Sequence, residues 1–176
     1  MNTDKYNSSD LVELLQKSAA EHLTTYRQLM ARDIGSVGTI FTTDFEAMYV
    51  YKRGDYQRCL QLSTQNVHTL LYAGRMIGVP IMLPELLQFL DDDIVSLTAL
   101  MLMVNPQCRG YSLYTCIDLL TLSLYLMTQC QLKLRHSVKS LAQTLEYIEV
   151  AQRSCPPDFT LNKLTLKLIK RVIVHL

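Results

Sequence analysis

The chain has 176 residues, 49% of them hydrophobic and 19% charged, with a formal net charge of +1. This length fits a single domain, and so apolar a chain can bury a large core, which excludes a disordered protein. The balanced charge excludes a typical nucleic-acid binder, because phosphate neutralisation needs a basic excess. It leaves self-association open, because little charge repels a second copy.

Few residues in the chain favour turns. There are six Gly and five Pro, which predicts long helices and an all-α fold rather than a many-stranded sheet. The five Cys include no Cys-x-x-Cys pair, so we expect reduced, mostly buried thiols. No apolar run reaches the roughly 18 residues of a membrane helix, and the polar N-terminus lacks a signal-peptide core. We therefore expect a cytoplasmic protein without a transmembrane segment.

The first helix is predicted at residues 10–33. Residues 1–9 are polar and are expected to be disordered, and residues 10–176 are expected to form one helical domain. Apolar residues recur at helical spacing from Leu11 to Met30. Gly35 is well placed to end this helix.

A helical hairpin is predicted next, with helices at residues 37–53 and 55–72 joined by a tight turn at Gly54. Ala47, the run Gly54-Asp55-Tyr56 and Cys59 resemble the consensus of a tetratricopeptide repeat. That family places small residues twelve positions apart where two helices cross, as Ala47 and Cys59 are here. The match covers about one repeat. A weaker echo of the spacing occurs at Cys130 and Ala142.

The resemblance implies a short, degenerate stack of such hairpins whose groove binds another protein or a peptide segment. A compact helical bundle is the alternative architecture. The groove-facing positions that the resemblance implies are Phe41, Asp44, Met48, Tyr51 and Lys52. The function that follows is a non-enzymatic scaffold or adaptor module.

The remaining chain is also predicted to be helical, which brings the total to six to eight helices in antiparallel hairpins. After an irregular connection at 73–84, a buried helix is expected at Ile94–Val104. A long helix apolar on most sides follows from Leu113 to about Arg135. Ser137 and Asp158 are then predicted to cap the last two helices.

Catalytic signatures are absent from the sequence, so no catalytic residue, metal or cofactor is expected. The carboxylates of Asp91–Asp93 fit a helix N-terminus better than a metal motif, because Val95 and Ser96 stand where further acids would be needed. An enzyme with a site assembled in space from Asp91–Asp93 or a Cys/His pair remains the alternative. A helical regulatory fragment that docks on a missing domain is a third possibility.

The last helix carries a basic side opposite its apolar one. A solvated face is the simplest interpretation, and the alternatives are an acidic lipid or the groove of a partner. The cations of this basic helix face are Lys163, Lys167, Lys170 and Arg171.

Overall fold

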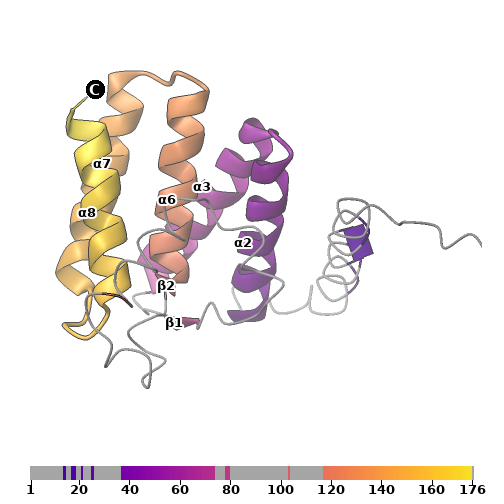
Figure 1. The fold of residues 1–176 in the computed structure, drawn as a ribbon, viewed down its shortest axis with the longest axis horizontal. Helices are drawn as coiled ribbons and strands as arrows, with labels where there is room; N and C mark the ends of the chain where they lie inside the picture. The colour runs from indigo at the N-terminus through magenta and orange to yellow at the C-terminus, as the bar shows by residue number, and fades with distance from the viewer. Residues whose placement is uncertain are drawn as a thin grey trace, which may run out of the picture.

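The structure is a computed structural model that describes residues 37–73, 78–79 and 117–175 and the isolated positions 14, 17, 18, 21, 25 and 103. Five helices have described bounds: α2 Val37–Lys52, α3 Tyr56–Ala73, α6 Leu119–Lys133, α7 Val138–Ser154 and α8 Thr160–Val174 (Figure 1). The predicted all-α class is confirmed for these residues, with five helices there rather than six to eight. Most of the helices predicted at Ile94–Val104 and at 10–33, and all of residues 1–9, lie outside the described residues. Met103, the described residue of the first of these helices, is 74% exposed, so the burial expected for that helix does not hold at this position.

Helix α6 lies at the centre of the fold. Figure 1 shows the α2–α3 hairpin on one side of it and α7 with α8 on the other. Every side chain from Leu119 to Thr128 is buried, because this stretch contains only apolar residues and small hydroxyl residues. The prediction of a helix buried on most sides is therefore confirmed, although α6 begins at Leu119 rather than at Leu113.

The later start of α6 has a local cause. Ile117–Asp118 forms the two-residue strand β2, which pairs antiparallel with β1 at Gly78–Val79. The carboxylate of Asp118 then caps α6, accepting hydrogen bonds from the backbone N–H of Thr121 at 2.7 Å and from its hydroxyl at 3.0 Å. Strands of two residues carry no alternating pattern, so sequence periodicity could not reveal them.

The α2–α3 hairpin turns through a Schellman motif. The N–H of Gly54 donates to the carbonyl of Tyr51 at 3.0 Å, and the N–H of Asp55 donates to the carbonyl of Val50 at 3.0 Å. Gly54 has φ +80°, which glycine adopts without steric cost. The predicted turn at Gly54 is therefore confirmed, and the Asp55 carboxylate caps α3 by accepting from the N–H of Arg58 at 3.0 Å.

The α6–α7 hairpin repeats this motif without a glycine. The N–H of Arg135 donates to the carbonyl of Leu132 at 3.1 Å, and the N–H of His136 donates to the carbonyl of Gln131 at 2.9 Å. Arg135 has φ +53°, the one non-glycine residue with a positive φ among the described residues. Ser137 then caps α7, as predicted, by accepting from the N–H of Ser140.

The start of α8 corrects a prediction. Asp158 does not cap this helix: its N-cap residue is Phe159, which makes no side-chain cap hydrogen bond. The entry to α8 is instead held by Asn162, which donates its amide to the carboxylate of Asp118 and accepts the N–H of Asp118 at 2.9 Å. This pair links the beginnings of α6 and α8 across 44 positions of sequence.

The small residues singled out in the sequence have different surroundings. Ala47 and Cys59 are both fully buried, in accord with a close approach of α2 and α3. Cys130 of α6 is fully buried as well, and its side chain hydrogen-bonds Cys59. That hydrogen bond, together with burial, raises the pKa of the Cys130 thiol. Ala142 is exposed, so the second pair does not repeat the packing of the first.

Candidate interaction surface

The residues predicted to line a groove mostly face the core. Asp44, Met48 and Tyr51 are 1%, 2% and 8% exposed, whereas Lys52 is exposed. Phe41 belongs to α2, but its side chain lies outside the described part of the structure. Of the four described side chains, only that of Lys52 is therefore open to a partner in this structure.

Asp44 shows why the inner side of α2 is closed. The hydroxyl of Ser123 on α6 donates to its carboxylate at 2.6 Å, and Asn66 of α3 also hydrogen-bonds it. Burial raises the pKa of Asp44 from 3.8 to about 7, although both hydrogen bonds act to lower it. Asp44 is thus a polar contact between three helices inside the core.

The outer side of α3 is exposed and carries almost no charge. Arg58 is the one Lys, Arg, Asp or Glu in this helix. The exposed residues that follow it at helical spacing are Gln61, Gln65, His68 and Tyr72. Tyr72 is 90% exposed. Solvated helix faces usually carry charges, whereas the centres of protein interfaces are depleted of them and enriched in tyrosine.

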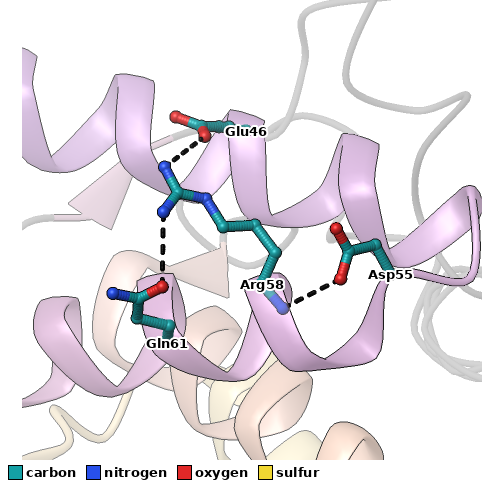
Figure 2. Close-up of polar contacts among 4 residues, drawn as sticks. All are labelled: Glu46, Asp55, Arg58 and Gln61. Carbon is teal, nitrogen blue, oxygen red and sulfur yellow. Dashed lines mark hydrogen bonds and ion pairs between the residues drawn. The ribbon is translucent and has the colours of Figure 1, made fainter.

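The single charge of α3 is held by its neighbours. Figure 2 shows Arg58 donating to Glu46 of α2 at 3.2 Å and to Gln61 at 3.3 Å, while its backbone N–H is bound by Asp55. The pair Arg58–Glu46 is half-exposed, so its ionic contribution to stability is below about 1 kcal/mol. Its main effect is to fix the side chains at the beginning of this exposed stripe.

An aromatic contact joins α3 to α7. The rings of His68 and Tyr147 meet edge to face with centroids 5.6 Å apart, and Gln143 donates to the Tyr147 hydroxyl at 2.8 Å. Val150, one turn further along α7, is 43% exposed. We define the α3–α7 face as His68, Tyr72, Tyr147 and Val150, a surface with apolar and aromatic groups and no formal charge.

This face was not predicted, although the sequence holds a signal for it. The apolar residues of α3 predict its core-facing side, and the opposite side is polar but nearly uncharged. The contact between His68 and Tyr147 spans two hairpins, so no local pattern could reveal it. The charge-poor stripe itself was visible in residues 56–73.

Two of the four cations on the predicted basic helix face are bound by other residues of the chain. Lys170 pairs with Glu149 of α7 at 3.0 Å, and Lys163 donates to the carbonyl of Pro157 at 3.0 Å. The hydrogen bond from Lys170 lowers the pKa of Glu149. Lys167 and Arg171 are exposed. The four cations therefore form two exposed positions and two that tie α8 to its surroundings.

The remaining chemical candidates receive no support from the described residues. Asp91–Asp93 lie outside them, and no group of three His, Cys, Asp or Glu within them could hold a metal ion. The described cysteines are free thiols: Cys59 and Cys130 are buried, and Cys155 is partly buried. Burial is the main cause that raises the pKa of Cys155, which makes it a weaker nucleophile at neutral pH.

Comparison with known proteins identifies no relative: no family model, no curated protein and no solved structure matches this chain. Within the described residues, every helix is too short or too polar to cross a bilayer.

Proposed function

We propose that the protein is a non-enzymatic interaction module that binds a partner protein on the α3–α7 face. The observation that carries the proposal is the uncharged, exposed stripe of α3 ending in Tyr72, which is 90% exposed. A tyrosine so exposed offers a large contact area with little conformational entropy to lose, and tyrosine is enriched at protein interfaces.

The contact with α7 extends the proposed surface beyond a single helix. The contact between His68 and Tyr147 continues the face from one hairpin onto the next. Partly buried aromatic anchors surrounded by polar groups are typical of interface hot spots. The predicted groove on the inner side of α2 is replaced in this proposal, since Asp44 and Met48 are buried.

The tetratricopeptide-like stack remains part of the proposal. Its support is that α2–α3 and α6–α7 turn through the same motif and are each followed by a capped helix. The architecture is compatible with a module that holds proteins together.

Site-specific photo-crosslinking tests the proposal. A photoreactive phenylalanine analogue at position 72 should capture a partner protein in extracts of the source cells. The same analogue at position 167, an exposed site on α8, is the matched control and should not capture it. His68→Ala combined with Tyr147→Ala should weaken capture from position 72 while leaving helical circular dichroism unchanged. Equal capture from both positions, or none from either, would refute the proposed surface.

A further inference from the structure

A second surface lies at one end of the bundle. Helices α6 and α8 run in the same direction and α7 runs against them, with the pair Lys170–Glu149 joining α7 and α8. Figure 1 shows that the α6–α7 turn and the C-terminal end of α8 consequently lie at the same end. The basic end is defined by four exposed cations at this place: Lys133, Arg135, Lys139 and Arg171.

Acidic side chains that could balance the basic end are few in the part of the chain that the structure describes. The whole chain is nearly neutral, yet residues 117–175 contain eight Lys and Arg against four Asp and Glu. No acid occurs at 119–145 or at 159–176. Among the described residues, none of the four cations makes an ion pair, while Glu149 further along α7 is already engaged by Lys170 and Arg153. A positive field therefore extends from this end.

Apolar side chains project beside these cations. Val138, the first residue of α7, is 83% exposed, and Val174, the last residue of α8, is 60% exposed. The α6–α7 turn and the C-terminal end of α8 form this surface. Val138 directly follows the turn and Val174 ends the helix, so both valines lie at the tip of the bundle. Exposed valines among cations fit a partner that is both anionic and able to accept apolar groups.

Arg135 adds an independent observation. Its backbone is left-handed, with φ +53°, a conformation that costs a side-chain-bearing residue energy and costs glycine none. Gly54 occupies the corresponding position of the other hairpin. The fold alone would favour glycine at this position, so the arginine is kept at an energetic cost, which motivates a functional hypothesis for its side chain.

We propose that the basic end docks on the surface of an anionic phospholipid membrane. Cations near such a surface each strengthen binding about fivefold, and Val138 and Val174 can enter the headgroup region. Nucleic acid is a poorer fit, because no Phe, Trp or Tyr lies at 131–141 or 170–175 to stack on bases. An acidic peptide would gain little from the projecting valines. The basic end is separate from the α3–α7 face, so this inference does not depend on the proposed function.

Vesicle co-sedimentation of the full chain tests the docking. Binding is expected to vesicles of phosphatidylcholine with 30% phosphatidylserine, but not to phosphatidylcholine alone, and should weaken as salt rises from about 0.1 to 0.5 M. Lys139→Gln with Arg171→Gln should weaken binding roughly thirtyfold. The matched control is Arg153→Gln with Lys163→Gln, which removes the same charge away from the basic end and should change binding less than twofold.

Arg135→Gly is a variant that is expected to keep its fold, because glycine adopts the left-handed conformation without cost. It should increase stability while weakening vesicle binding about fivefold, a combination that a purely structural role would not give. Val138→Ser should weaken binding at high salt more than at low salt. Equal binding to vesicles with and without phosphatidylserine would overturn the proposal. An equal loss of binding in the Lys139→Gln, Arg171→Gln variant and in its control variant would also overturn it. Tighter binding to single-stranded DNA or to polyglutamate at the same salt would overturn the lipid assignment.

Discussion

Gly54 and Arg135 occupy the same position of the same helix-ending motif, and both have a positive φ, +80° and +53°. Each donates its N–H to the carbonyl three residues before it, at 3.0 Å and 3.1 Å. The two hairpins of the fold therefore turn alike, although only one of them shows the glycine that such a turn favours.

Replacing Arg135 by glycine should stabilise the protein. The left-handed conformation costs a residue with a Cβ about 1 kcal/mol, and glycine removes that cost while keeping both backbone hydrogen bonds. Urea unfolding monitored by circular dichroism should give a free energy of unfolding about 1 kcal/mol higher for Arg135→Gly. An unchanged or lower value would mean that the Arg135 side chain contributes contacts that offset the strain.

Replacing Gly54 by alanine should destabilise the α2–α3 hairpin. A Cβ placed on Gly54 would meet no atom within 4 Å, so the cost of Gly54→Ala is conformational rather than steric. We expect the free energy of unfolding to fall by about 1 kcal/mol. Gly54→Asn is the control, since asparagine tolerates this region better and should cost less than alanine. Equal losses for the two variants would contradict a conformational origin.

Local signals made most of the hairpins predictable. Gly54 with Asp55, and Ser137 before α7, are short-range turn and cap signals, and the helices they delimit lie within one or two residues of those predicted. The α6–α7 turn was harder, because an arginine in a left-handed position leaves no trace in the sequence. Asp158 failed as a cap because the chain enters α8 through a backbone turn, in which the N–H of Phe159 donates to the carbonyl of Pro156.

The proposed interaction surface was less predictable than the fold. Helix α2 has a broad apolar surface, so its sequence alone does not reveal which side packs inward. The side of α2 that packs inward is determined by long-range contacts, such as the hydrogen bond from Ser123 to Asp44, two residues that lie 79 positions apart. Three of the positions that the resemblance assigned to a groove, Asp44, Met48 and Tyr51, are buried in the core of this chain.

Asp44 should make stability fall as pH rises. Burial raises its pKa in the folded protein from 3.8 to about 7, so the folded state retains a proton that the unfolded chain releases above pH 3.8. The contribution of the Asp44 carboxyl to the free energy of unfolding is fully present below pH 3.8. It is lost progressively as the pH rises to about 7. The shift corresponds to at most roughly 4 kcal/mol.

The variant Asp44→Asn isolates this effect. Its free energy of unfolding, measured by urea titration at intervals from pH 4 to 8, should rise relative to that of the natural chain as pH increases. Glu149→Gln gives a contrast of opposite sign, because Lys170 lowers the pKa of Glu149 and its contribution is lost as pH falls. A constant difference between Asp44→Asn and the natural chain would show that Asp44 titrates normally.

Asp118 and Asn162 should contribute jointly to stability, because their hydrogen bonds hold the beginnings of α6 and α8 together. Asp118→Ala removes the cap of α6, worth about 1 kcal/mol. It also leaves the buried amide of Asn162 without its acceptor, which costs about 1 to 3 kcal/mol more. We therefore expect a loss of about 2 to 4 kcal/mol in the free energy of unfolding.

A double-mutant cycle can measure the coupling between them. Asn162→Ala alone should also destabilise, because the N–H of Asp118 then loses its acceptor. In the double variant part of each loss is shared, so the combined loss should be about 1 to 2 kcal/mol smaller than the sum of the single losses. Thr160→Ala, at the first residue of α8, is a control expected to be additive with Asp118→Ala. Strict additivity of Asp118→Ala and Asn162→Ala would show that the beginnings of the two helices are held together by other contacts.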